Sequence, residues 1–433
     1  MTNRDMARKI FDSALDAANP FSAVAQRAGD IKSIYEKGGF NRLIVAGFGK
    51  GAFAMARAAE ETLGDILERG IIVTKYGHAG QHPLKKIKTL EAAHPVPDEN
   101  GRKAAEEIFA FLKTADERTL VLCLISGGGS ALLVAPVDGI ALEEKKAITQ
   151  LLLKSGATIH QVNAVRKHIS KIKGGRLAEA AYPAKIISLI VSDVLGNSLD
   201  VISSGPTAPD NSRYADALAV LDSFDITGST PKGVLDVLRN GAAGFLPETP
   251  KPGCKIFSRV ENIVIASNLA ALTAARDYAS NLGLNARIIS ESVQGDVADA
   301  AHWLAQCAIE AKASHEKRPI CLISGGETTV KVRGSGVGGR NMELALIFAL
   351  QVQKTSGITL LSAGTDGSDG PTDATGAIVC STTVPESKEK GLDANSFLEN
   401  NDSYNFFSKA EGLLKTGSTG TNVMDIQIVI VGE

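Results

Sequence analysis

Short apolar runs alternate with amphipathic segments along most of the chain. Runs that end in glycine or polar turns are typical of buried strands, and apolar residues spaced three or four apart are typical of helices. On this pattern the predicted strands are 43–46, 71–74, 121–125, 186–191, 262–266, 286–290, 320–323, 359–363 and 426–431. The longest predicted helices are 6–18, 52–63, 268–282 and 297–312. Alternation of this kind predicts an α/β protein.

A change of composition at residues 227–258 indicates a connection between two domains. Glycine and proline recur through this segment, and a second series of strands and helices follows it. A chain of 433 residues is long enough for two cores. We therefore predict an N-terminal Rossmann-like domain with a doubly wound parallel sheet over 1–240, and a C-terminal α/β domain with a mixed sheet over 241–433.

The segment 320–346 contains the strongest pattern in the chain. An apolar run stops at two glycines, a short alternating segment follows, and four more glycines precede an amphipathic run. Glycine lets backbone N–H groups turn towards an anion, and a helix N-terminus adds partial positive charge. An anion site is therefore predicted here, and a purely structural tight loop is the alternative. The candidate site residues are Glu327, Gly338, Gly339, Arg340 and Asn341.

Two further glycine turns follow predicted strands in the N-terminal half. The first, 47–51, contains Lys50 and leads into a helix, which is the phosphate-binding unit of open parallel sheets. A lysine in such a turn can reach a phosphate as a compact point charge, although a solvated turn lysine is the simpler reading. The candidate residues of the two turns are Gly49, Lys50, Ser126, Gly127, Gly128, Gly129 and Ser130.

The first turn also fits a rival function. Gly47, Gly49 and Ala52 satisfy the G-x-G-x-x-A pattern of dinucleotide-binding folds. That pattern expects an acidic residue at the end of the second strand to hold the ribose, and this strand is followed by Lys75 instead. The missing carboxylate weakens the hypothesis of an NAD-dependent reductase, but the basic residue is compatible with a reductase that uses NADP.

Carboxylates follow two of the predicted strands. Asp193 comes directly after the strand 186–191, at the sheet edge where open α/β folds bind ligands. Asp366, Asp369 and Asp373 lie in a glycine-rich loop after the strand 359–363. Oxygen ligands of this kind suit Mg²⁺ or another divalent cation, although aspartates also form turns and helix caps.

A basic run lies between residues 166 and 176, with Arg166, Lys167, Lys171, Lys173 and Arg176. Such a run is by default a solvated face of a helix. It could also deliver one or two cations to a carboxylate substrate, and we take Arg166 as the candidate.

Net charge and composition limit the classes of partner. Lys plus Arg number 46 against 48 Asp plus Glu, which gives no global field to attract nucleic acid or anionic lipid. The start of the chain has no apolar signal core, and no apolar run approaches the ~18 residues of a membrane span. Five widely spaced cysteines indicate neither a disulfide framework nor a zinc site. We expect a cytoplasmic protein with small-molecule substrates and leave a homodimer open.

Eight ordered segments resemble the glycerate 2-kinase family, whose C-terminal half is the MOFRL domain. They cover almost the whole chain and are far more specific together than any single glycine loop. The chain departs from the family pattern in two places: Asn197-Ser198 stands where Asp-Pro is usual, and Ser418 stands where Pro is frequent. The segments are 47–56, 93–101, 124–133, 163–178, 192–207, 324–346, 363–377 and 416–425.

The resemblance implies that ATP phosphorylates D-glycerate at its 2-hydroxyl, giving 2-phosphoglycerate and ADP, in a cleft between the two domains. It implies that Lys50 is the essential lysine and Arg340 the essential arginine. Some family members carry the name hydroxypyruvate reductase, so an NAD(P)H-dependent reductase is the alternative. A kinase is favoured because several glycine turns, cations and carboxylates suit phosphoryl transfer. Asp193 or the loop of Asp366 would orient Mg²⁺ or accept the hydroxyl proton.

Overall fold

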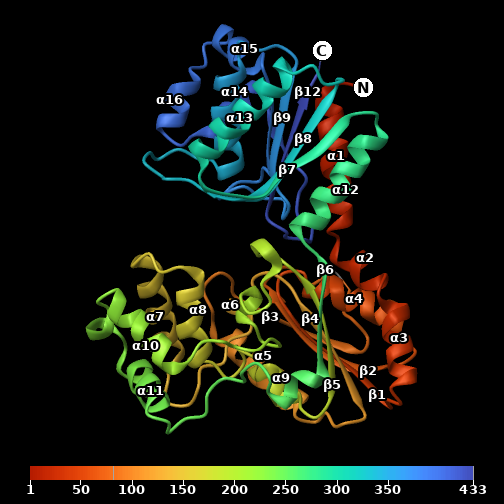
Figure 1. Ribbon diagram of the computed structural model, residues 1–433, viewed down its shortest axis with the longest axis vertical. Helices are drawn as coiled ribbons and strands as arrows, with labels where there is room; N and C mark the ends of the chain where they lie inside the picture. Colours follow the sequence, from red (N-terminus) through yellow and green to blue (C-terminus); the bar gives the residue numbers. More distant parts are fainter. Residues whose placement is uncertain (81, 433) are drawn as a thin grey trace. The chain divides into compact units, whose positions relative to one another are not determined.

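The computed structural model describes residues 1–80 and 82–432, and the chain divides into two compact units (Figure 1). The first unit is Pro20–Ile265, and the second unit combines Met1–Asn19 with Ala266–Glu433. Over 1–80 and 82–432, no helix has both the length and the apolar character needed to cross a bilayer.

The first unit contains a six-stranded sheet with the order β3-β2-β1-β4-β5-β6. The neighbouring strands from β3 to β5 all pair in parallel. This order is that of doubly wound dinucleotide-binding folds, and it reverses between β1 and β4. The predicted Rossmann-like parallel sheet is confirmed. The strands are β1 (Arg42–Phe48), β2 (Leu67–Lys75), β3 (Ile87–Ala92), β4 (Thr119–Ile125), β5 (Lys185–Val191) and β6 (Val260–Ala266).

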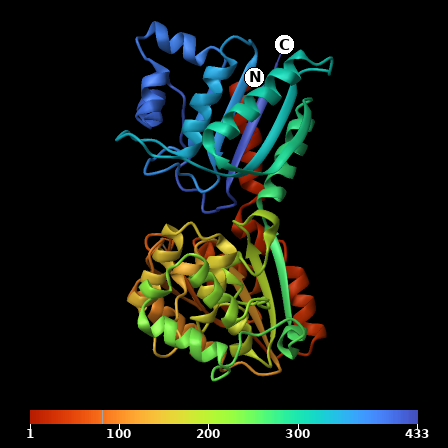
Figure 2. The same cartoon turned by 60° about the vertical axis from the view of Figure 1, so that its left-hand side comes forward.

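Helices cover both faces of this sheet (Figure 2). α2 (Pro20–Ala25), α3 (Ala28–Lys37) and α4 (Ala52–Leu63) lie on one face, and α5 (Glu99–Leu112) and α9 (Arg176–Ala181) pack on the other. Because both faces are covered, strands such as β4 are buried along their whole length, and this explains their continuous apolar sequence. The short α6 (Gly129–Leu132) follows β4 directly.

Four further helices of the first unit form a bundle with its own core: α7 (Leu142–Lys154), α8 (Ile159–His168), α10 (Tyr214–Ser223) and α11 (Lys232–Ala242). The domain boundary expected between residues 240 and 241 falls inside α11, and the compact unit continues to Ile265. A Cβ added at Gly241 would lie 2.3 Å from the ring of Tyr214. Glycine in this segment therefore permits close helix packing rather than marking a linker.

The second unit contains a mixed sheet with the order β11-β10-β9-β12-β8-β7, as predicted. β7 and β8 are parallel, and the other pairs are antiparallel. β12 lies between β8 and β9 and is buried throughout. The strands are β7 (Asn285–Asp296), β8 (Ile320–Thr329), β9 (Ile358–Gly364), β10 (Gly376–Cys380), β11 (Leu413–Leu414) and β12 (Asp425–Val431).

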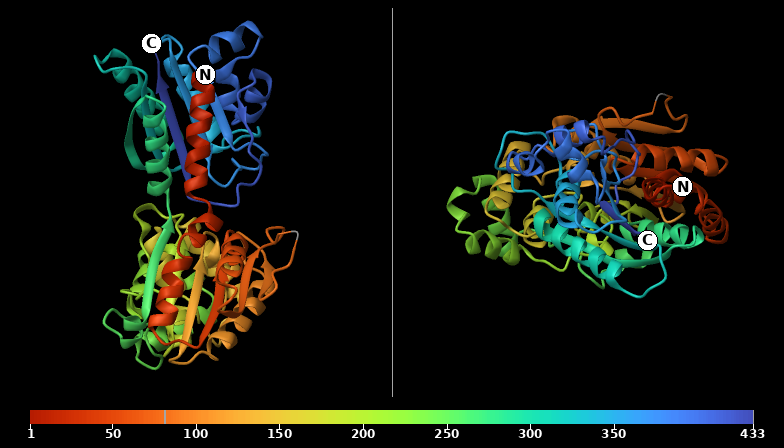
Figure 3. Two further views of the ribbon diagram at one scale, coloured as in Figure 1. Left: turned by 90° about the vertical axis from the view of Figure 1, so that its right-hand side faces the viewer. Right: turned by 90° about the horizontal axis from the view of Figure 1, so that it is seen from above.

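The helices of the second unit come from both ends of the chain. α1 (Asn3–Ala17) packs beside α12 (Asn268–Asn281) and against β9 and β12 (Figure 3). α13 (Val297–Ala313) and α14 (Arg340–Val352) contribute to the core on the other face. The helix predicted over 6–18 is confirmed, with a buried stripe that includes Ile10 and Phe11. The remaining helices are α15 (Thr383–Glu389), α16 (Ala394–Glu399) and α17 (Ser403–Ala410).

Candidate active site

Two of the predicted glycine turns meet where the strand order of the first unit reverses. β1 and β4 are neighbours, and their last residues, Phe48 and Ile125, are paired. The turns 49–51 and 126–130 therefore leave the same edge of the sheet. The N–H of Lys50 donates to the carbonyl of Gly127 (2.8 Å), and the N–H of Gly51 donates to Oγ of Ser126 (3.0 Å). This is the position at which open parallel sheets bind ligands.

Gly49 is required by this meeting of the two turns. Its φ is +123°, a conformation that residues with a side chain rarely adopt. A Cβ at this position would lie 2.2 Å from Oγ of Ser126 and 2.4 Å from its carbonyl oxygen. The turn therefore has room for the backbone alone.

Four polar side chains lie against the loop 126–130. A Cβ built at Gly127 would lie 2.4 Å from Oδ2 of Asp193, and one at Gly129 would lie 2.5 Å from Oγ of Ser203. A Cβ at Gly128 would lie 2.9 Å from the ring of His94 and 3.3 Å from Cγ of Lys50. The predicted residues Lys50 and Asp193 are thus held against the same glycine loop. His94 adds a group that can donate or accept a hydrogen bond.

The charge around this loop is mainly positive. Burial, followed by the charges of Lys50 and Lys75, lowers the pKa of His94 to about 4. Burial and the same two lysines also lower the pKa of His78. Both imidazoles are therefore neutral near pH 7, and the lysines supply the positive charge that a phosphate would meet.

The predicted solvated face over 166–176 is wrong, because much of this basic run is buried. Lys167 is 4% exposed and pairs with Asp210 (3.2 Å) and Asp200 (3.3 Å). Lys173 is 1% exposed, and its Nζ donates to the carbonyl and Oγ of Ser130 (3.2 and 3.1 Å). The helix α8 ends at His168, so helical spacing does not describe the residues that follow.

In the second unit, Arg340 is held by a bidentate pair with Asp425. Its Nε and Nη2 donate to the two carboxylate oxygens (2.6 and 2.9 Å), and its Nη1 lies 2.7 Å from Oε1 of Glu327. Burial disfavours the charge of Arg340, but hydrogen bonds and attraction from Asp425 outweigh it and raise the pKa of the guanidinium. Burial raises the pKa of Asp425 to about 6 against the opposing effect of Arg340. The guanidinium is thus charged and fixed in orientation.

The glycine loop before Arg340 uses its amides within the fold. The N–H groups of Arg333 and Gly334 donate to Oδ1 of Asn401 (2.7 and 3.0 Å). The N–H of Gly336 donates to the carbonyl of Asn400 (2.9 Å), and a Cβ on Gly336 would lie 2.4 Å from Asp402. These contacts give Gly334 and Gly336 a structural reason, and the anion site predicted at Gly338 and Gly339 stays a prediction.

The start of α14 is occupied in the same way by Asp369. Its carboxylate accepts the backbone N–H groups of Asn341 (3.1 Å) and Met342 (2.8 Å). A Cβ on Gly339 would lie 2.3 Å from Cγ of Asp369, and one on Gly338 would lie 2.4 Å from Oγ of Ser403. The negative charge that this helix N-terminus attracts therefore comes from the protein itself.

The three aspartates predicted to bind a metal have different environments. Asp369 caps α14, and burial raises its pKa against the opposing hydrogen bonds from the helix. Asp373 is exposed and accepts hydrogen bonds from Tyr404 and Lys415 (both 2.8 Å). Asp366 accepts the N–H of Ser368 (3.2 Å). Among the described residues, no three His, Cys, Asp or Glu side chains group closely enough to hold a metal ion.

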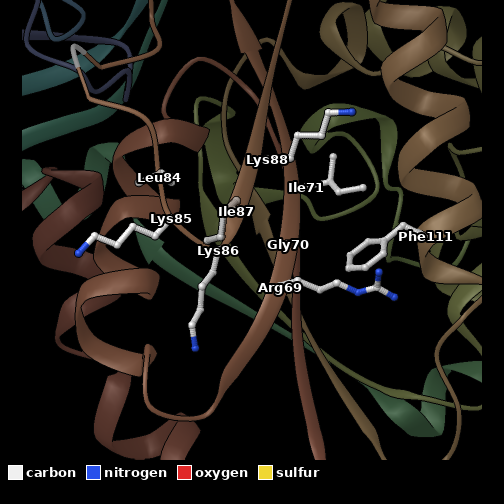
Figure 4. A pocket seen from close by; sticks show the side chains of 9 residues that line it. All are labelled: Arg69, Gly70, Ile71, Leu84, Lys85, Lys86, Ile87, Lys88 and Phe111. Carbon is white, nitrogen blue, oxygen red and sulfur yellow. The ribbon is translucent and has the colours of Figure 1, made fainter.

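A separate basic hollow of about 370 Å³ lies at the beginning of β2 and β3 (Figure 4). Figure 4 shows Lys85, Lys86 and Lys88 pointing in different directions, and the guanidinium of Arg69 turned to the ring of Phe111 (5.2 Å). Strands enter the sheet here, whereas the glycine turns lie where strands leave it. The hollow has no convergent group that would bind an anion.

The sequence reasoning missed Lys145 of α7 and Asn163 of α8. Lys145 is buried on the same face of α7 as Ile148 and Leu152. Their spacing of three and seven residues matches one face of a helix, so the periodicity could have placed this lysine inside the protein.

Comparisons with known proteins agree with this architecture. The model of a domain of unknown function, DUF4147, matches residues 6–239, and the MOFRL family model matches residues 320–425. D-glycerate 2-kinase of Thermotoga maritima is 42% identical over 99% of this chain and 98% of its own length. The crystal structure of glycerate kinase from Thermotoga maritima superposes with a TM-score of 0.89, at 42% identity and 99% coverage of both chains.

A relative from Agrobacterium vitis carries the provisional name of a hydroxypyruvate reductase. It is 40% identical over 99% of this chain and 94% of its own length. The two family models and the full-length likeness to kinases agree with the paired glycine turns of the first unit and the fixed arginine of the second. This chain belongs to the glycerate 2-kinase family.

Proposed function

We propose that this chain transfers the γ-phosphoryl group of ATP to the 2-hydroxyl of D-glycerate, giving 2-phosphoglycerate and ADP. The observation that carries the proposal is the meeting of two glycine turns at the reversal point of the sheet, with Lys50 and Asp193 beside them. The printed names of the kinase relatives support the same reaction. Phosphoryl transfer needs positioning and charge neutralisation, which such a site supplies.

Lys50 and Asp193 have complementary roles in this proposal. The 2-hydroxyl oxygen attacks the γ-phosphorus, the bond to the β-phosphate oxygen breaks, and ADP leaves with that electron pair. Asp193 accepts the hydroxyl proton and later releases it to water. Lys50 neutralises the negative charge on the transferred group. Gly49 and Gly127 allow the backbone to approach the phosphates closely.

Arg340 is the second proposed catalytic cation. The bidentate pair with Asp425 keeps its guanidinium in one orientation, so little ordering remains to be done when substrate binds. We propose that it binds either the transferred group or the carboxylate of glycerate. The predicted cleft between domains, the cytoplasmic location and the homodimer stay predictions.

The carboxylates near the glycine turns suit a Mg²⁺ ion that binds together with the nucleotide. Such Mg²⁺ needs only one or two protein carboxylates, because substrate phosphates and water complete its coordination. Asp193 lies against Gly127, and the part-exposed Asp366 follows β9 at its carboxyl end. Either carboxylate could hold the ion, which would supply charge neutralisation of the phosphates.

The reductase remains the rival function because of one relative's name and the glycine pattern at 47–52. β2 ends at Lys75, and the carboxylate of Glu91 on β3 accepts the N–H of Gly77 (2.8 Å). No ribose-binding carboxylate therefore ends β2.

The test measures ADP release by the purified protein with D-glycerate, ATP and Mg²⁺, and identifies the product by phosphorus NMR. A parallel assay supplies hydroxypyruvate with NADH or NADPH. We expect ADP and 2-phosphoglycerate in the first assay and no oxidation of nicotinamide in the second. Lys50→Ala should lower turnover by about 10³.

Lys88→Ala is the matched control, since Lys88 is an exposed lysine of the same sheet that pairs with Glu107. Its turnover should match that of the wild type. Glycerate-independent ADP release, or hydroxypyruvate reduction at comparable rates, would refute the kinase.

A further inference from the structure

Three cations lie close together inside the first unit: Lys145 on α7, Arg166 on α8, and Lys173 after α8. Lys145 is 3% exposed and Lys173 is 1% exposed, while Arg166 is partly buried. Burial, followed by repulsion from Arg166, lowers the pKa of Lys145 to about 7. Burial and repulsion from Arg166 and Lys145 hold the pKa of Lys173 well below its usual value. The three groups therefore repel one another in a poorly hydrated place.

This cluster has no counter-charge within the described part of the chain. No carboxylate forms an ion pair with Lys145, Arg166 or Lys173 there, and Nζ of Lys145 has no hydrogen-bond partner at all. The amide nitrogen of Asn163, on the same turn of α8 as Arg166, is also buried without an acceptor among those residues. Buried cations and donors without partners are costly, so a ligand that supplies negative charge is the natural compensation.

Lys167 shows that the lack of a partner is particular to the cluster. It is buried to the same degree as Lys145 and comes from the same basic run as Arg166, yet it pairs with both Asp200 and Asp210. The buried Lys167, which has a structural role, is thus neutralised by carboxylates of the protein. Lys145 has no such carboxylate and instead borders a hollow.

The hollow has a volume of about 320 Å³. Its polar lining includes Ser130, Lys145 and Arg166 together with other polar residues of α7, and residues 95–97 with Leu153 form an apolar wall. Ser130 also belongs to the glycine loop 126–130, and Lys173 donates to it. The hollow thus begins at the proposed phosphate loop and continues away from it along an apolar surface.

We propose that this hollow is the nucleotide subsite, in which Lys145 and Arg166 bind the phosphate chain and the apolar wall receives the base; Lys173, hydrogen-bonded to Ser130, adds positive charge beside it. A phosphate chain carries several negative charges, whereas the single charge of glycerate would leave most of the cluster uncompensated. A volume of this size is also far larger than a three-carbon acid requires and lies near the lower end of the usual range for small-molecule and cofactor sites. The inference rests on the proposed kinase function and assigns its nucleotide to these residues.

The test compares binding of pyrophosphate, ADP, adenosine and D-glycerate to the full chain by calorimetry. Lys145→Met and Arg166→Gln should each weaken pyrophosphate and ADP binding at least tenfold and leave D-glycerate binding unchanged. In turnover assays they should raise KM for ATP by a similar factor with little change in KM for D-glycerate. Lys145→Arg should retain most of the pyrophosphate affinity, because it keeps the charge.

Lys154→Met is the matched control, since Lys154 is an exposed lysine at the end of the same helix. It should bind all four ligands like the wild type. Thermal melts without ligand show whether each variant folds, and Lys145→Met should melt at or above the wild-type temperature because it removes an uncompensated buried charge. A purely structural lysine would give a lower melting temperature and unchanged pyrophosphate affinity, which would overturn the proposal.

Two other outcomes separate this inference from the proposed function. Loss of D-glycerate binding with intact pyrophosphate and ADP binding would overturn the inference and assign the cluster to the carboxylate substrate. Absence of glycerate-dependent ADP release in a wild type that binds pyrophosphate through Lys145 would refute the kinase reaction and support the anion subsite.

Discussion

Two cationic side chains, Arg340 in the second unit and Lys145 in the first, differ in whether the fold supplies a counter-charge. In the second unit, Arg340 has a bidentate carboxylate partner, Asp425, and a second contact with Glu327. In the first unit, Lys145 is buried more deeply than Arg340, at 3% exposed, and its Nζ has no hydrogen-bond partner among the described residues. A cation with its own counter-charge is fixed in place before any ligand arrives, whereas a cation without one depends on the ligand for compensation. Arg340 is therefore held in one orientation by the protein, whereas Lys145 requires a ligand to compensate its charge.

Removal of Arg340 should give the largest effect. In Arg340→Met, Asp425 becomes a buried carboxylate without a counter-charge, so the free energy of unfolding should fall by about 3 kcal/mol and turnover by about 10³. Denaturation and ADP release measure the two effects. The double variant Arg340→Met with Asp425→Asn should recover stability without recovering turnover. Recovery of both would show that Arg340 serves only the fold.

The same variant has a defined pH dependence. Burial raises the pKa of Asp425 from 3.8 to about 6 in the folded protein, so its contribution to stability is complete below pH 3.8 and is lost as the pH rises through the folded pKa. Without the attraction of Arg340 that pKa rises further, and the loss extends to higher pH. Arg340→Met should therefore be more destabilised at pH 8 than at pH 5. Urea denaturation at the two pH values measures the difference.

Gly49→Ala should produce the next largest effect, on the first unit. The new Cβ meets both Oγ and the carbonyl of Ser126, and the positive φ is unfavourable for alanine. We expect about 3 kcal/mol of destabilisation, measured by denaturation, and a matching loss of activity. Gly77→Ala is the control, because its φ is also positive, +76°, but nothing lies within 4 Å of the added Cβ. It should cost about 1 kcal/mol, the price of the backbone conformation alone.

Lys145→Met should give a smaller effect with the opposite sign. The pKa of Lys145 is lowered from 10.5 to about 7, so its contribution to stability is present above pH 10.5 and is lost as the pH falls towards 7. The variant should exceed the wild type by about 2 kcal/mol at pH 7 and by less at pH 9.5. Denaturation at both pH values tests this, with Lys154→Met as the reference. If the variant were less stable than the wild type at pH 7, Lys145 would stabilise the fold, and it would no longer differ from Arg340 in this respect.

Asp373→Asn should give the smallest effect. Its ion pair with Lys415 is exposed to solvent, so its loss should change the stability very little. We expect an unchanged dependence of turnover on Mg²⁺ concentration, measured by titration of the metal. A tenfold higher Mg²⁺ requirement would make Asp373 a metal ligand, as the sequence pattern suggested.

Sequence patterns predicted the strands and helices more accurately than the hydrogen-bond acceptors of the glycine-loop amides. Strands such as β4 and β12 are buried on both faces, so their apolar runs reveal them directly. The loop 334–339 and the turn 47–51 look alike in sequence, but the amides of the first loop donate to residues 400–402, more than sixty positions away. No local pattern tells which distant side chain accepts an amide.

The same reason explains the errors over the basic run and the aspartate loop. Helical spacing was applied past His168, where α8 ends, and thus Lys173 was expected to be exposed. Asp369 was grouped with its neighbours in sequence, whereas in space it caps α14, which precedes it along the chain. Burial and capping are set by tertiary packing, which a window of ten residues does not contain.

The placement of α1 has a consequence for biosynthesis. This helix is synthesised before the first unit, yet β9 and β12, the strands on which it packs, are made only after the whole first unit. Its apolar stripe, which includes Ile10 and Phe11, must stay shielded from aggregation during that delay. A fragment that starts at Ala266 would keep α12 over β7 and β8 but would lack the helix that covers β9 and β12. The second unit should therefore be recoverable on its own only when residues 1–19 are supplied as a peptide or fused ahead of it.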